Sequence, residues 1–379
     1  MNSKPSVADG APTGRQALAG SHPVDWPMAA RVADRLVRPG PATDRDEASA
    51  LVADLRRAAG VAVGHAARIT GLAPAAGSDP SVSGVSQVLV VDRSGWVRAN
   101  TELLAALTAG IGATPDGRRP SRATRVVGAA EAAGVLSVLS GKVLGQFDPF
   151  TRTAGPDGVP RGRLLLVAPN VLQIERDLEV DPGDFRLWVA LHEQTHALQF
   201  ATAPWLVDHL RARTGALLAD LTREDGHDER ERARALATMV ARALRGADDV
   251  PGLDSLLRPG ERRVFEEVGA VMALLEGHAD VAMDAVGAAV VPTVARIRAR
   301  FEARRSGHGR RGRRADRVLR RLLGLDLKLA QYREGAAFVR AVTGAVGQDG
   351  LNAVWDAPAN LPGAREIADP RAWVRRVHG

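Results

Sequence analysis

The sequence feature that most constrains the fold of this chain is the stretch 187–200, which contains the pattern H-E-x-x-H. Asp181 and Pro182 precede it and form an N-cap followed by proline at the first helical position, so the pattern is expected to lie on a helix. On that helix His192 and His196 are four residues apart, so both rings leave the same face, one turn apart. The rest of that face is apolar, which predicts that the two histidines point inward.

Two imidazoles with this spacing can bind one tetrahedral Zn²⁺, and Glu193, one step round the helix, can reach a water on the metal. The alternative is a pair of core histidines that are satisfied by hydrogen bonds and bind no metal. A third ligand decides between the two. The chain contains no cysteine, so that ligand must be a histidine or a carboxylate.

The best third ligand is Glu276, on a helix expected from 261 to about 290. Glu276 lies on or beside the apolar stripe of that helix, where an ionised carboxylate is costly unless it is paired or bound to a metal. His278 lies two residues away on a different face and is the alternative ligand. Asp280 is one turn beyond Glu276 and is placed to hydrogen-bond the free ring nitrogen of a ligating histidine.

The rest of the chain indicates a mainly α fold with a small β-sheet (α+β). Residues 1–23 are rich in Gly, Ala, Ser and Pro and are expected to be a disordered tail. Residues 24–160 are expected to form a mostly helical part, packed as one continuous unit with a catalytic part at 161–379. Helices are expected at 44–70, 96–110, 124–144, 182–203, 206–222, 232–245, 261–290 and 325–342, strands at 85–92 and 163–170, and a Pro/Gly-rich connection at 148–162. The strand at 163–170 either presents its edge to an extended peptide or is a plain core strand.

The net charge of +7 is concentrated in the segment 296–321, which holds twelve arginines against Glu302 and Asp316. Such a segment could grip nucleic-acid phosphates, but it lacks interleaved aromatic residues and matches no nucleic-acid module. A solvated loop is the favoured interpretation, and a nucleic-acid partner is not expected. The sequence has no secretory leader pattern and no long apolar run, which predicts a cytoplasmic protein without a membrane span.

H-E-x-x-H followed by a helix with E-x-x-x-D, here Glu276 to Asp280, resembles the gluzincin branch of zinc metallopeptidases. More closely, the chain resembles a family of zincin-like proteins from actinobacteria, labelled as zinc-dependent metalloproteases or hydrolases and sometimes associated with deazaflavin-coenzyme biosynthesis. The resemblance covers nearly everything after residue 24 and includes V-D-W from 24, HEQTH from 192, LEGHADVAMD from 275 and K-x-x-Q-Y-x-x-G from 328. It implies a zincin-like metalloprotease fold and zinc held by His192, His196 and Glu276, but it implies no substrate.

Tyr332 is the only tyrosine in the chain and shares one side of a helix with Lys328. Zinc peptidases commonly place a donor beside the metal to hold the developing oxyanion, and Tyr332 is a candidate for that role, with Lys328 the weaker one. The alternative is a buried tyrosine whose hydroxyl is satisfied elsewhere.

These observations predict a zinc-dependent hydrolase, and most simply a metallopeptidase, that acts on a peptide or a small amide. Glu193 would take the proton of the attacking water and pass it to the leaving amine. The main alternative is a non-catalytic protein that keeps the zinc scaffold for binding. Glu193 favours the enzyme, because a purely structural site needs no base there.

Overall fold

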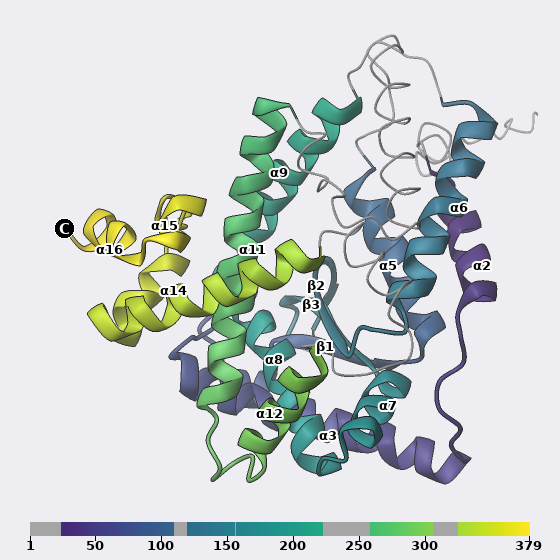
Figure 1. Cartoon of the computed structure of the whole chain (residues 1–379), viewed down its shortest axis with the longest axis horizontal. Helices are drawn as coiled ribbons and strands as arrows, with labels where there is room; N and C mark the ends of the chain where they lie inside the picture. The colour runs from purple at the N-terminus through teal and green to yellow at the C-terminus, as the bar shows by residue number, and fades with distance from the viewer. Residues whose placement is uncertain (1–23, 110–119, 156, 223–257, 306–324) are drawn as a thin grey trace, which may run out of the picture.

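A computed structural model of the chain describes residues 24–109, 120–155, 157–222, 258–305 and 325–379, without the side chains of 216–222, 305 and 325–333 (Figure 1). The fold is mainly helical with one small sheet, and the expected fold class is confirmed. The helices are α2 (Trp26–Leu36), α3 (Arg45–Thr70), α4 (Pro80–Ser83), α5 (Arg93–Leu107), α6 (Arg122–Leu139), α7 (Ala168–Leu178), α8 (Pro182–Thr202), α9 (Trp205–Thr222), α11 (Pro259–Ala285), α12 (Val294–Arg305), α14 (Leu325–Asn352), α15 (Ala364–Ala368) and α16 (Pro370–His378). The strands are β1 (Ser86–Val91), β2 (Gly145–Ala154) and β3 (Pro160–Val167).

The sheet has the order β1-β3-β2, with β1 parallel and β2 antiparallel to β3. It joins strands from both sides of position 160, the boundary expected between the two parts of the chain. The strand expected at 163–170 is therefore the central strand β3, and Leu164 and Leu166 on it are fully buried. A central strand has no free edge for a peptide, so the core-strand alternative is the correct one.

The prediction of an irregular connection over 148–162 was wrong, because this stretch forms most of the β2–β3 hairpin. The ladder between the two strands is interrupted between Asp148 and Thr153, where Pro149 lies. A proline inside a strand removes a ladder donor and is tolerated at an edge or a bulge, which hides the strand from sequence patterns. Strand β2 lies at an edge of the sheet, beside the motif helix α8.

Capping residues explain where several elements begin and end. Helix α3 matches its predicted bounds, since Asp44 caps its start and Gly71 ends it with φ 66°, a conformation that favours glycine. Helix α5 begins before the expected residue 96, because Asp92 accepts the Gly95 N–H and caps it. Helix α7 was not expected, since Pro169 was interpreted as a strand stop, whereas it sits in the first turn of the helix. The helix expected at 232–245 lies outside the described residues.

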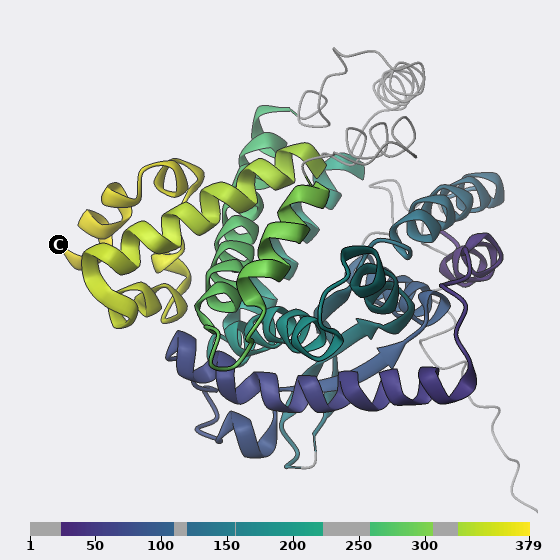
Figure 2. The same cartoon turned by 60° about the horizontal axis from the view of Figure 1, so that its bottom comes forward.

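Helix α8 is the centre of the molecule, packed between the sheet, helix α3 and helix α11 (Figures 1 and 2). Its apolar side chains are buried on nearly every side, among them Phe185, Leu191 and Leu198. A helix that is buried on nearly every side belongs in the core, so the motif is held by packing on several faces. This packing fixes the direction of each motif side chain.

Helices α11 and α14 cross at very close range, as Figure 1 shows. A Cβ on Gly277 would lie 2.2 Å from the backbone of Gly335, and a Cβ on Gly335 would lie 1.9 Å from the carbonyl oxygen of Ala273. Only glycine permits this backbone contact. The crossing fixes the position of α11 directly beside Glu276.

The described part of the arginine-rich segment is the helix α12, not the solvated loop that was predicted. Its arginines bind carboxylates of neighbouring helices: Arg298 lies 2.7 Å from Asp284, and Arg304 lies 2.9 Å from Asp177. Residues 306–321 of the segment lie outside the described part of the chain. None of the described helices is long and apolar enough to cross a membrane.

Candidate metal centre

Three side chains from two helices converge on one point. His192 and His196 leave one face of α8, and their Nε2 atoms lie 3.2 Å apart. Oε2 of Glu276, on α11, lies 3.4 Å from Nε2 of His192 and 3.7 Å from Nε2 of His196. Among the described residues these three form the one group whose donor atoms are close enough together to share a metal ion.

The donor set fits zinc. Ligands about 2.0–2.1 Å from one tetrahedral Zn²⁺ lie roughly 3.3 Å from one another, close to the separations of the three donor atoms here. Two neutral ring nitrogens that face each other at 3.2 Å repel unless a cation lies between them or one carries a proton. The geometry of the pair therefore suits a metal ion between the two rings or a proton on one of them.

Gln199 orients one of the two rings. Its Nε2 donates to the Leu275 carbonyl at 3.0 Å and to Nδ1 of His278 at 3.0 Å, so its Oε1 is left as an acceptor. That oxygen lies 2.9 Å from Nδ1 of His196. Nδ1 of His196 therefore carries the hydrogen, which leaves Nε2 free to bind a metal. In the described part of the chain, Nδ1 of His192 is buried without a hydrogen-bond partner.

His278, the alternative third ligand, is turned away from the metal centre. Its Nδ1 accepts from Gln199, and its ring packs edge-on against Trp355 at 5.4 Å between centroids. Burial, with the charge of His196 as a smaller cause, lowers the pKa of His278 to about 4 and keeps the ring neutral. It supports the centre through Gln199, and Glu276 is the side chain that reaches both histidines.

Without a metal, the ligands hold a proton in its place. Burial disfavours a charged His196, but the carboxylates of Glu276 and Glu193 and a hydrogen bond to Gln199 together outweigh burial and raise the pKa of His196 to about 9. Burial likewise opposes ionisation of Glu276, yet His196 and a hydrogen bond from His192 lower the pKa of Glu276 well below its usual range. The two shifts favour a charged His196 beside an ionised Glu276 when no metal is bound, and a metal ion must displace the proton of His196.

Glu193 is buried beside the three ligands but is not one of them. Its carboxylate accepts a hydrogen bond from the backbone N–H of Phe147 on the edge strand β2. Burial raises the pKa of Glu193, and the two motif histidines act against that rise. A Cβ on Gly145 would lie 2.7 Å from Oε1 of Glu193, so the lack of a side chain on β2 makes room for the carboxylate.

A family model described as a zincin-like metallopeptidase matches residues 24–374. The chain belongs to the zincin-like metallopeptidase family. This family implies zinc, and His192, His196 and Glu276 form the site for it in this structure. The predicted resemblance is confirmed at this level, while its narrower actinobacterial and deazaflavin association stays a prediction.

The chain is also similar to a solved structure from Chloroflexus aurantiacus, described as a "putative hydrolase with a novel fold". The two chains are 28% identical, with a TM-score of 0.63, over 94% of this chain and 99% of the other. Among curated proteins, none matches the chain.

The remaining expected site residues lie elsewhere or are not described. Asp280 was expected to bond a ligating histidine, but its Oδ1 accepts from Arg298 at 3.0 Å instead. Helix α12 supplies that guanidinium, and no pattern within α11 reveals it. Tyr332 and Lys328 lie on α14, and their side chains are outside the described part of the structure.

Three residues with evident structural roles at the site were missed from the sequence. Gln199 carries no charge, but it lies three residues after His196 on an apolar face, and that spacing is the signal that was available. Gly145 and Phe147 act through a strand that was not predicted, so no local pattern could have identified them.

Proposed function

We propose that this zincin-like metallopeptidase hydrolyses peptide or small amide bonds with zinc and with Glu193 as general base. Bound by His192, His196 and Glu276, zinc supplies Lewis-acid chemistry: it polarises the carbonyl and lowers the pKa of the attacking water. The observation that carries the proposal is the placement of Glu193, a buried carboxylate beside the ligands that does not belong to the ligand set.

The proton steps belong to Glu193. The Phe147 N–H and the space above Gly145 hold its carboxylate toward the ligands, so it can accept the proton of the attacking water. Burial raises the pKa of Glu193, which makes it a better acceptor, and as an acid it can then protonate the leaving amine. A non-catalytic zinc scaffold has no use for this carboxylate.

Tyr332 remains our candidate for the donor to the developing oxyanion, with Lys328 as the weaker candidate. Both lie on α14 within two turns of Gly335, where α14 contacts α11 next to Glu276. Cytoplasmic location and a link to deazaflavin-coenzyme biosynthesis remain predictions from the sequence.

The test is cleavage of a mixed peptide library by zinc-loaded protein, with and without chelator, beside Glu193→Gln. We expect defined cleavage products that disappear with chelator and return with zinc. A positioned general base contributes about 10²–10⁴-fold in rate, so Glu193→Gln should slow cleavage by about that factor. Cleavage by Glu193→Gln at the wild-type rate would rule out Glu193 as the base. No cleavage of any peptide or amide by zinc-loaded protein would favour the scaffold.

A further inference from the structure

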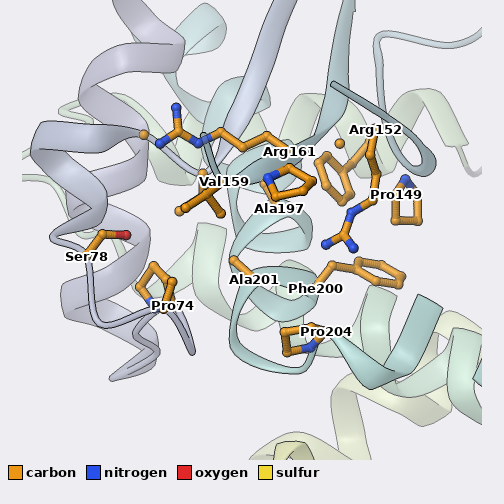
Figure 3. Close-up of a pocket in the computed structure, with 16 residues that line it drawn as sticks. Pro74, Ser78, Pro149, Arg152, Val159, Arg161, Ala197, Phe200, Ala201 and Pro204 are labelled. Atoms are coloured by element: carbon orange, nitrogen blue, oxygen red, sulfur yellow. The ribbon is translucent and has the colours of Figure 1, made fainter. Parts of the chain in front are cut away.

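A small pocket lies between the C-terminal half of α8 and the β2–β3 hairpin (Figure 3). It has a volume of about 90 Å³, and its apolar wall includes Phe147, Ala197, Phe200 and Ala201. No carboxylate lines it, and its two charged residues are arginines.

The pocket adjoins the metal centre through two of its wall residues. Ala197 directly follows His196 and lies one helical turn beyond Glu193. Phe147 donates its backbone N–H to Glu193, while its ring lines the pocket 5.7 Å from the ring of Phe200. Glu193 and the three ligands do not line the pocket, so a substrate whose side chain fills it would reach the centre with its neighbouring groups.

The charge of the pocket comes from one arginine. Arg161 is held by Asp157 at 2.6 Å, which neutralises its charge. Arg152 has no ion-pair partner in the described part of the chain, and Figure 3 shows its guanidinium directed toward Phe200 at the rim. A guanidinium beside an apolar pocket selects a carboxylate attached to an apolar group.

The size of the pocket restricts the apolar group. An engineered apolar cavity of about 150 Å³ takes benzene, and this pocket is smaller. A branched aliphatic group of the size of a leucine side chain suits it better than an aromatic ring.

We propose that this pocket is a substrate subsite that binds an aliphatic side chain and pairs Arg152 with a carboxylate of the same substrate. The carboxylate is either the free C-terminus of a peptide or an acidic side chain next to the aliphatic residue. The proposal rests on the proposed function and names its substrate class: peptides with an aliphatic residue beside a carboxylate.

Binding of 4-methylpentanoate, measured by calorimetry on the full chain, tests the pocket without turnover. We expect binding that is about tenfold weaker for the uncharged 4-methylpentan-1-ol and for Arg152→Gln, since the charge-assisted hydrogen bond is lost. Ala201→Leu fills the pocket and should weaken binding by a similar factor. Arg371→Gln, at an exposed arginine on α16, is the matched control and should bind as wild type does. The bulkier 3-phenylpropionate should bind more weakly than 4-methylpentanoate.

A carboxylate held by zinc itself is a distinct outcome. If the pocket is the site, chelator-treated protein should still bind 4-methylpentanoate. The subsite is overturned if removal of zinc abolishes binding, or if Arg152→Gln and Ala201→Leu leave binding unchanged. Zinc-dependent cleavage of peptides would stand in either case, so failure of the subsite and failure of the proposed function are distinguishable.

Two peptides identify the source of the carboxylate, with Glu193→Gln used to prevent turnover. One peptide ends in leucine with a free carboxylate, and the other is amide-capped with aspartate next to leucine. We expect Arg152→Gln to weaken binding of one of the two peptides about tenfold. The peptide affected shows whether the carboxylate is a free C-terminus or an acidic side chain. If the substitution affects neither peptide, the proposal is wrong.

Discussion

Replacement of Gln199 by leucine should separate support of the metal from packing of the core. Gln199 is fully buried, and its amide joins His196, Leu275 and His278 through three hydrogen bonds of 2.9–3.0 Å. Leucine has a similar size but no hydrogen-bonding group. The change leaves Nδ1 of His196 and Nδ1 of His278 buried without a hydrogen bond from this side chain.

The expected magnitudes follow from those contacts. Each buried polar group that loses its partner costs about 1–3 kcal/mol, so two of them predict a loss of about 2–6 kcal/mol in the free energy of unfolding. Loss of the outer partner of a ligating histidine typically weakens metal binding about 10–100-fold. Zinc affinity measured by competition with a chromophoric chelator should fall by about that factor for Gln199→Leu.

Two further variants identify the cause. Gln199→Glu keeps the acceptor for His196 but loses the donor to His278, so it should destabilise the fold and yet bind zinc within a few-fold of wild type. Gln194, on the same helix, is also buried and donates to the Ala59 carbonyl at 2.9 Å, away from the ligands. Gln194→Leu should lower stability and leave zinc affinity unchanged. If Gln199→Leu destabilised the fold but bound zinc as tightly as wild type, our assignment of Gln199 would be refuted.

Three further predictions concern the same centre. Gly145→Ala puts a methyl group 2.6–2.7 Å from the side chain of Glu193, so hydrolysis should fall at least tenfold while zinc content, measured by elemental analysis, stays full; normal activity would argue against close contact. Gly277→Ala forces helices α11 and α14 apart and should destabilise the protein by about 1–3 kcal/mol in denaturant unfolding, whereas an unchanged midpoint would contradict the crossing. In zinc-free protein the pKa of His196 is raised from 6.5 to about 9, so its stabilisation is complete below pH 6.5 and is lost as the pH rises through 9. The pKa of Glu276 is lowered from 4.5, so its contribution is present above pH 4.5 and is lost in acid. The contribution of this pair to the stability of chelator-treated protein should therefore be greatest between pH 4.5 and 6.5, as measured by thermal unfolding. Equal stability at pH 6 and pH 9.5 would contradict this prediction.

The sequence was sufficient to predict the metal ligands because the patterns that identify them are local. The spacing of His192 and His196, the N-cap at Asp181 and the polar Glu276 on an apolar stripe placed three side chains on two buried helices. Helical periodicity determines which side chains share a face, so it predicted the inward-facing ligands on each helix. The packing of α8 against α11 then brings these ligands together.

The sequence was insufficient where a role depends on a neighbour from a distant part of the chain. Asp280 lies one turn beyond Glu276 on α11, but its Oδ1 accepts from Arg298, which comes from α12. Strand β2 is masked by Pro149 and by its irregular ladder, and with it the closeness of Gly145 to Glu193 was hidden. Periodicity predicts faces of elements, whereas these contacts depend on how the elements pack.

The most direct test of the central claim is the zinc content of purified protein, measured by elemental analysis across four matched proteins. We predict about one zinc per chain in wild type and in Glu193→Gln, because Glu193 is not a ligand. His192→Ala and Glu276→Gln should be nearly empty, because each removes one of the three donors. Zinc lost from Glu193→Gln but retained by Glu276→Gln would reverse the two roles and contradict the account.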